Sequence, residues 1–181
     1  DFAGKWSHYE ESLRVPLIIR DPRRGTDNYG HTVDNMALNL DIPATILDIA
    51  GIKQPVSYQG RSLFPFTAGV EVQDWRTEFF IEHLMEFGDN LPKYEGVRDE
   101  RMVYARYFEQ DPVYEFLHDL HRDPDQLENL AADPAYQETL NDFRTRTNTW
   151  VAASGGPYNR DEFQARPTAT SSEPPNLLLI I

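Results

Sequence analysis

The 181-residue chain carries 30 acidic and 17 basic side chains, which gives a formal net charge of −13. This excess of acid argues against a general nucleic-acid binder, because phosphate binding needs clustered Lys and Arg. Hydrophobic residues make up 40% of the chain, enough to build a folded core. No apolar run approaches the roughly 20 residues needed to span a bilayer. The lack of Cys excludes disulfides, thiolate zinc sites and a cysteine nucleophile within this stretch.

Both ends of the sequence indicate a piece of a longer chain. Residue 1 is Asp, and no signal-peptide pattern follows it. The last six residues, 176–181, form a strand-like apolar run that stops without a loop after it. We therefore expect further coding sequence on both sides of this chain.

The first half of the chain predicts one buried strand and one short helix. Residues 15–20 are a β-branched run followed by a turn cluster, which predicts a buried strand. Residues 41–51 predict a helix in which Asp41 is the N-cap and Pro43 lies in the first turn. Gly51 stands where a left-handed C-terminal residue belongs.

The second half predicts an antiparallel sheet covered by a helix, which is an α+β arrangement. Short apolar segments at 78–82, 96–98, 102–108 and 113–117 are separated by Asp, Gly and Pro turn signals. Asp133 and Pro134 then open a helix. One face of this helix carries the large residues and one threonine: Tyr136, Leu140, Phe143, Thr147 and Trp150.

After Trp150 the composition becomes rich in Ser, Thr, Pro and Gly. Residues 153–174 are therefore predicted to be an exposed linker. Residues 175–181 are predicted to be extended, because the run is too short for a stable helix and too apolar for an exposed loop.

Three side chains are the candidates for chemistry. Lys5 offers a compact ammonium to an anionic ligand, or else is a surface lysine whose stem packs on Trp6. His8 has the residue type for proton transfer, or else is a structural histidine with satisfied ring nitrogens. His83 ends an apolar strand, a common position for a site residue. We expect both histidines near a substrate pocket rather than in the core, and His118 in a solvated turn.

Four blocks of sequence, in this order, resemble type I sulfatases of the alkaline phosphatase-like superfamily: GKWSHYEESLRVPLI (residues 4–18), DIPATILDIAG (residues 41–51), QGRSL (residues 59–63) and YEFLHDLHRDPDQLENLA (residues 114–131). The second is similar to the family's DLxPTLLDLAG helix, and the third to its QGxSL turn. The fourth resembles its ELYDLxxDPxExxNLA block, although residues 116–119 replace the usual Leu-Tyr-Asp. The resemblance covers about residues 1–152.

The resemblance implies a hydrolase of sulfate esters in which Lys5 contacts the sulfate group, with His83 and His8 as substrate-binding residues. The family's formylglycine nucleophile and its Ca²⁺ carboxylates would lie upstream. No formylglycine motif occurs in this chain, and we assign no metal ligand here. The chain alone should therefore be inactive. The family also implies a sulfated small molecule or glycan as substrate and a periplasmic or secreted location.

The expected domain organisation follows from the same resemblance. Residues 1–70 would be the last segment of the α/β catalytic domain, and residues 71–152 a C-terminal subdomain with a small antiparallel sheet and a packed helix. Residues 175–181 resemble the first strand of a second sulfatase unit. Two alternatives stay open: a phosphonate or phosphate ester hydrolase of the same superfamily, and a non-catalytic interaction module.

Overall fold

The structure is a computed structural model, and it describes residues 5–23, 30–85 and 92–159. Two compact units are present. Of the described residues, one unit contains 5–14, 78–85 and 92–159, and the other contains 15–23 and 30–77. Residues 5–14 thus pack with the sheet rather than with the segment that follows them. Most of the expected linker and the tail strand at 175–181 lie outside the described residues.

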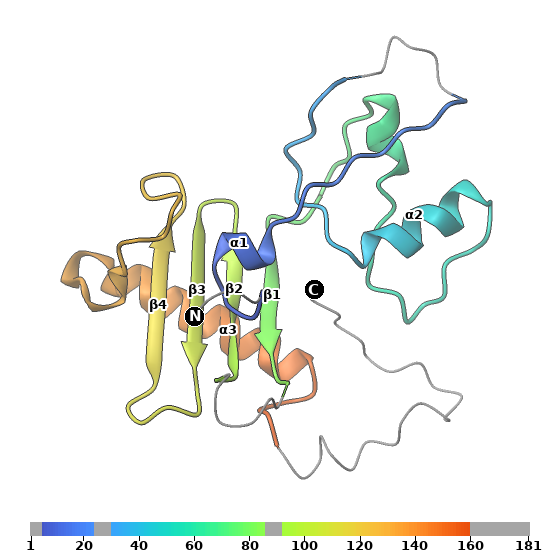
Figure 1. Cartoon of the computed structure of the whole chain (residues 1–181). Helices are drawn as coiled ribbons and strands as arrows, with labels where there is room; N and C mark the ends of the chain where they lie inside the picture. Colours follow the sequence, from blue (N-terminus) through green and yellow to red (C-terminus); the bar gives the residue numbers. More distant parts are fainter. Residues whose placement is uncertain (1–4, 24–29, 86–91, 160–181) are drawn as a thin grey trace. The chain divides into compact units, whose positions relative to one another are not determined.

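The first unit is built on one four-stranded antiparallel sheet with the order β1-β2-β3-β4 (Figure 1). Its strands are β1 (Glu78–His83), β2 (Tyr94–Asp99), β3 (Met102–Tyr107) and β4 (Tyr114–Asp119). Each strand pairs with its neighbour in sequence, as short turns between strands favour. The sheet predicted from the turn signals is confirmed.

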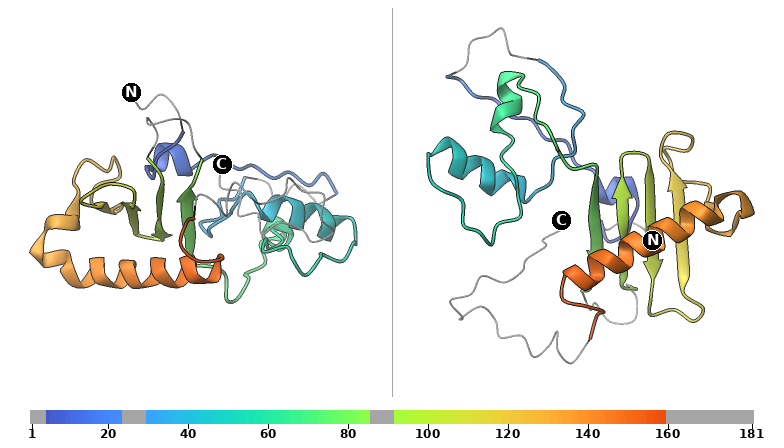
Figure 2. Two further views of the ribbon diagram at one scale, coloured as in Figure 1. Left: turned by 90° about the horizontal axis from the view of Figure 1, so that it is seen from below. Right: turned by 180° about the vertical axis from the view of Figure 1, so that it is seen from behind.

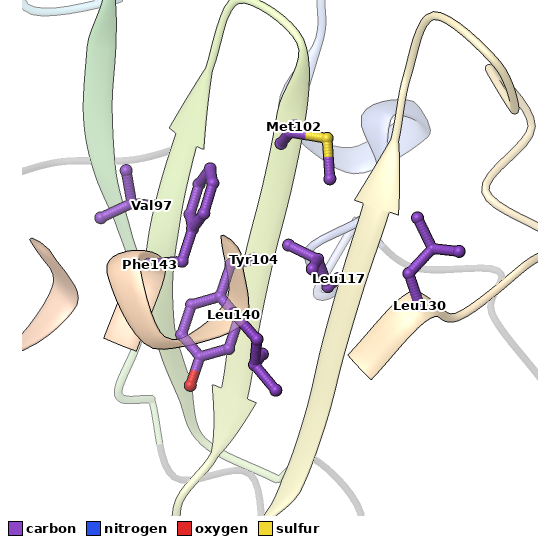
Figure 3. Packing of buried hydrophobic residues seen from close by; sticks show 7 residues of the cluster. All are labelled: Val97, Met102, Tyr104, Leu117, Leu130, Leu140 and Phe143. Atoms are coloured by element: carbon purple, nitrogen blue, oxygen red, sulfur yellow. The ribbon is translucent and has the colours of Figure 1, made fainter. Parts of the chain in front are cut away.

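Side chains of β3 enter two separate cores, one on each face of the sheet. Met102 and Tyr104 join the first core, which also contains residues from α3 (Figure 3). Val103, Ala105 and Tyr107 join the second core on the opposite face. Because side chains of a strand alternate between faces, a strand that is apolar at nearly every position needs cover on both sides.

One cover is the helix α3 (Gln137–Ala153). Two 3₁₀ turns, η3 (Leu130–Ala132) and η4 (Pro134–Tyr136), lead into it, and the Asp133 side chain caps the second by accepting from Ala135 N. Leu140 and Phe143 are buried against the sheet, while the indole of Trp150 stacks on Phe80. The predicted helix and its apolar face are confirmed.

The other face of the sheet carries the segment 5–14, which includes the short helix α1 (Glu10–Leu13). Figure 2 shows α1 and α3 on opposite sides of the sheet. Leu13 packs against the second core. The sheet is therefore the middle layer of a three-layer unit.

The second unit contains α2 (Asp41–Ile49) and the 3₁₀ helix η2 (Phe64–Ala68). Pro43 and Gly51, with φ of 67° at the glycine, take their predicted places. The expectation that Asp41 is the N-cap is wrong, because Asp41 is already helical and follows the N-cap Leu40. Its buried carboxylate instead accepts from Arg61 N at 2.8 Å and pairs with the Arg76 guanidinium.

A close backbone contact explains the glycine in the QGRSL block. A Cβ added at Gly60 would lie 1.8 Å from the Leu40 carbonyl oxygen, so only glycine fits. The next residues are held by side chains of α2: Thr45 Oγ1 accepts from Leu63 N, and Ser62 Oγ donates to Asp48. Two blocks that are separate in sequence thus brace each other.

The strand predicted at residues 15–20 is not formed. These residues are extended but exposed, with Ile18 90% exposed, and they are not part of the sheet that the described residues contain. An apolar run becomes a strand only when a neighbouring strand pairs with its backbone. Among the described residues no helix is both long and apolar enough to cross a bilayer.

A matched pair of leucines tests the core under α3. Leu140 is 1% exposed and Leu127 is 86% exposed. We expect Leu140→Ala to lower the free energy of unfolding by about 2–5 kcal/mol, because it leaves a cavity between helix and sheet. Leu127→Ala should change it by less than about 0.5 kcal/mol. Urea unfolding of both variants checks this, and equal effects would contradict the packing described.

Candidate functional site

The candidate site lies in the first unit, where the segment 5–14 crosses the sheet face opposite α3. His8 is the residue that fixes this segment, because its side chain is fully buried. The ring packs at centroid distances of 4.8 Å from Phe116 and 5.7 Å from Tyr107. Our expectation that His8 lies outside the core is therefore wrong.

A chain of hydrogen bonds passes through the buried ring. His8 Nδ1 lies 2.9 Å from the Tyr107 hydroxyl, and His8 Nε2 lies 3.4 Å from Nε2 of His118. His118 Nδ1 lies 2.9 Å from the Glu128 carbonyl oxygen. A carbonyl only accepts, so we assign the proton of neutral His118 to Nδ1. It follows that His8 donates from Nε2 and that the Tyr107 hydroxyl donates to His8 Nδ1.

Burial keeps both imidazoles neutral. Desolvation, with a smaller contribution from His118, lowers the pKa of His8 from 6.5 to about 3. Burial likewise lowers the pKa of His118, although its bond to Glu128 and the charge of Asp123 oppose the shift. The expectation of a solvated turn at His118 is wrong, since this side chain is 1% exposed.

Further contacts hold the same segment. The Glu10 carboxylate accepts two hydrogen bonds from the Arg98 guanidinium, at 3.2 and 3.1 Å. The Glu10 backbone N–H donates to Gln126 Oε1 at 2.6 Å. Ser7 and Ser12 hydroxyls lie 3.0 Å apart across the turn into α1. Residues 7–12 are thereby fixed to β2 and to the loop after β4.

The anchored segment places Trp6 against His83, the last residue of β1. Their rings meet edge to face with centroids 5.5 Å apart. The neighbouring Lys5 is exposed, and no ion pair joins it to a described residue. Lys5 and His83, which are 78 positions apart in sequence, thus come from adjoining parts of one unit.

His83 has shielded ring nitrogens that no described residue contacts by a hydrogen bond. Neither Nδ1 nor Nε2 forms a hydrogen bond within the described part of the chain. Burial is the main cause that lowers the pKa of His83, and the nearby Lys93 charge adds to it. A neutral imidazole offers one donor and one acceptor. Leaving both unsatisfied costs on the order of 1–3 kcal/mol for each group, so a ligand that supplies partners would be favoured.

The described residues do not fit a calcium site. They contain no group of three or more His, Asp or Glu side chains that could hold a metal. Two acidic residues at the end of β4 and in the loop after it have structural contacts: Asp119 pairs with Arg101, and Asp123 accepts from Glu128 N. Asn129 bridges back to β4 by accepting from Leu117 N.

Sequence reasoning missed the partners that surround His8. Tyr107 and His118 come from β3 and β4, at sequence separations of 99 and 110 from His8. Alternation in β3 places Tyr107 on the face opposite Tyr104 and could have indicated its core. No local pattern indicates that this core receives a histidine from residues 5–14.

Comparison of the sequence with known proteins identifies a family to which this chain is similar. The family described as "N-sulphoglucosamine sulphohydrolase, C-terminal" matches residues 2–152. A multifunctional alkaline phosphatase superfamily protein, PehA of Trinickia caryophylli, is 30% identical over 81% of this chain. A Δ4,5-hexuronate-2-O-sulfatase of Bacteroides thetaiotaomicron is 29% identical over 93% of it. The chain spans only 30% and 34% of the lengths of these two relatives.

A solved structure of a 2-O GAG sulfatase superposes on 68% of this chain and 27% of its own, with a TM-score of 0.60 and 29% identity. The family match covers most of the chain, including the segment of Lys5, the sheet and α3. The chain therefore belongs to the N-sulphoglucosamine sulphohydrolase C-terminal family and is a C-terminal portion of the type I sulfatase kind, within the alkaline phosphatase-like superfamily.

Proposed function

We propose that this chain forms the C-terminal part of an enzyme that hydrolyses sulfate esters, and that Lys5 contacts the sulfate group. The observation that carries the proposal is the placement of an exposed lysine beside Trp6, whose ring packs on the imidazole of His83. The nitrogens of that imidazole form no hydrogen bond with a described residue. A cation on the anchored segment and a neutral donor–acceptor group at the end of β1 thereby adjoin each other.

Lys5 would act on charge that grows during the reaction. As the S–O bond of a sulfate monoester breaks, negative charge increases on the departing and the remaining oxygens. An ammonium that is already in position stabilises that charge without reorganisation at the moment of reaction. The fixed backbone at His8 and Glu10 supplies this position, because it holds the turn from which Lys5 extends.

His83 would orient the substrate rather than carry charge. The neutral ring can donate one hydrogen bond to a sulfate or sugar oxygen and accept one from a hydroxyl. Its edge-to-face contact with Trp6 and its stacking on Tyr94 at 5.9 Å restrict the ring plane. Restricted side chains lose little entropy on binding, which favours a defined substrate pose.

The nucleophile and the metal would come from other parts of the whole protein. In sulfatases that resemble this chain, a formylglycine and Ca²⁺ supply the attack and part of the charge neutralisation. We propose that residues 1–70 complete the α/β catalytic domain and that residues 71–152 form the subdomain. The exposed apolar residues at 15–20 support the assignment to a larger catalytic domain, because a further strand of that domain could pair with them and bury them.

We propose a sulfated glycan or a sulfated small molecule as substrate, and a periplasmic or secreted location. The support for a glycan is the similarity to a Δ4,5-hexuronate-2-O-sulfatase and to a 2-O GAG sulfatase. Sulfated glycans are polyanions with many hydroxyls, which suits an ammonium beside a neutral imidazole.

A second candidate is a phosphonate or phosphate ester hydrolase, because PehA is named as a multifunctional member of the superfamily. Lys5 would serve a phosphoryl group as well as a sulfuryl group. The discriminating assay compares one preparation of the whole protein on an aryl sulfate, an aryl phosphate and an aryl phosphonate ester. Highest kcat/KM on the sulfate supports the first proposal, and no turnover of any ester supports a non-catalytic module.

Removal of the Lys5 ammonium tests its role. We expect Lys5→Ala in the whole protein to lower kcat/KM for the preferred sulfate ester by on the order of 10²-fold, as loss of one such contact does. Lys53→Ala is the matched control, because Lys53 is also exposed but lies in the other unit. Unchanged turnover in a folded Lys5→Ala variant would refute the assignment.

The role of His83 is tested by a pair of substitutions. We expect His83→Ala to lower kcat/KM by on the order of 10-fold, since one or two ligand hydrogen bonds are lost. His83→Gln keeps a donor and an acceptor and should recover part of the loss. His121→Ala, at an exposed histidine, serves as the control. Equal kinetics for the wild type and His83→Ala would remove His83 from the site.

A further inference from the structure

The contact between His8 and His118 lies in the interface between the segment 5–14 and the sheet. His8 belongs to the segment, and His118 belongs to β4. Other anchors of the segment include the Glu10 contacts to Arg98 and Gln126 and the packing of Leu13. Two titratable rings are thus enclosed where the segment that bears Lys5 meets the rest of the unit.

The ring nitrogens of the pair leave no free position for a second proton. Two nitrogens carry protons and donate, to His118 Nε2 and to the Glu128 carbonyl, and two accept. If both rings were protonated, N–H groups would face each other across the 3.4 Å contact. If one ring were protonated, the Tyr107 hydroxyl would have to turn, and a charge would still be buried.

We propose that His8 and His118 are positioning residues for Lys5, and that they form an acid-sensitive latch: the neutral pair holds residues 5–14 on the sheet, and proton uptake by the pair releases the segment. The consequence for turnover rests on the proposed function of Lys5. The release itself does not, because it concerns only the packing of one segment on the sheet.

Among the described residues, the groups that face His8 most closely are uncharged rings. The rings that face His8 are Tyr9 on its own segment, Tyr94 on β2, Tyr107 on β3 and Phe116 on β4. Burial raises the pKa of each of these tyrosines, so they stay neutral.

Charged groups of the described residues also lie around the histidine pair and the segment 5–14. Asp123 acts on His118 from the loop after β4 and favours its charged form. Glu11 acts on Tyr9. The ion pair of Glu10 and Arg98 flanks the segment. Burial still outweighs these charges, since the pKa values of both histidines are lowered.

The sign of the pH effect follows from linkage. A histidine whose pKa is lowered by packing binds its proton more readily in the released state, where the pKa is near 6.5. The latch is therefore fully closed above about pH 6.5 and weakens as the pH falls below that value. Each proton taken up on release raises the opening constant by up to about tenfold per pH unit.

Hydrogen exchange on the whole protein tests the latch without any assay of activity. Exchange of peptides covering residues 5–14 and α3 is followed by mass spectrometry between pH 7.5 and 4.5, with each rate corrected for intrinsic exchange at that pH. We expect the protection of residues 5–14 to fall by about 10-fold or more per pH unit below pH 6.5. The protection of α3 should fall less. Parallel loss in both peptides, or constant protection of residues 5–14, would overturn the proposal.

Variants distinguish protonation of the two rings from general unfolding of the protein at low pH. His8→Phe and His118→Phe each leave one titratable ring, so each should show a smaller pH slope than the wild type. His121→Phe, at an exposed histidine, should keep the wild-type slope. An unchanged slope in a folded His8→Phe protein would contradict the latch. If both core variants fail to fold, the wild-type comparison of the two peptides still decides.

Activity then distinguishes the latch from the proposed chemistry. With Lys5 as the sulfate contact, kcat/KM for the sulfate ester should fall over the same pH range as the protection of residues 5–14. A pH-dependent release with no matching change in turnover would leave the latch standing and refute the role of Lys5. Constant protection of residues 5–14, together with a large loss of turnover in Lys5→Ala, would refute the latch and support the role of Lys5.

Discussion

The two-sided burial of β3 is the constraint on which the rest of the unit depends. Met102 and Tyr104 point into one core, while Val103, Ala105 and Tyr107 point into the other. A sheet that is apolar on both faces is stable only when both are covered. The helix α3 covers one face, and a segment from the start of the chain covers the other. The position of Lys5 is therefore a result of how the sheet buries its second face.

This constraint explains why some titratable residues are structural while others are candidates for substrate binding. His8 is enclosed and hydrogen-bonded, whereas His83 at the edge of the same region has two ring nitrogens that bind no residue in the described part of the chain. The acidic residues after β4 hold a loop and pair with Arg101. Substrate contacts are thus proposed only at Lys5 and His83. The other residues of the blocks that carry the family resemblance mainly make structural contacts.

The sequence predicted those parts whose evidence is local. The strands from β1 to β4 and the face of α3 follow from alternation, turn residues and helical spacing over short windows. Residues 15–20 were wrongly predicted as a strand, because pairing depends on a neighbour that the window does not contain. His118 was wrongly placed in solvent, because Asp119, His121 and Arg122 beside it are polar and its cover comes from residues 110 positions earlier.

The central claim is that packing of residues 5–14 on the sheet brings Lys5 to a sulfate-binding site. A crystal structure of the whole protein soaked with inorganic sulfate tests it most directly. The account predicts a sulfate oxygen within about 3 Å of Lys5 Nζ, a normal hydrogen-bond distance, with the His8 ring enclosed against His118. A sulfate bound in the catalytic centre without Lys5, or a segment 5–14 that is detached from the sheet at neutral pH, would contradict it.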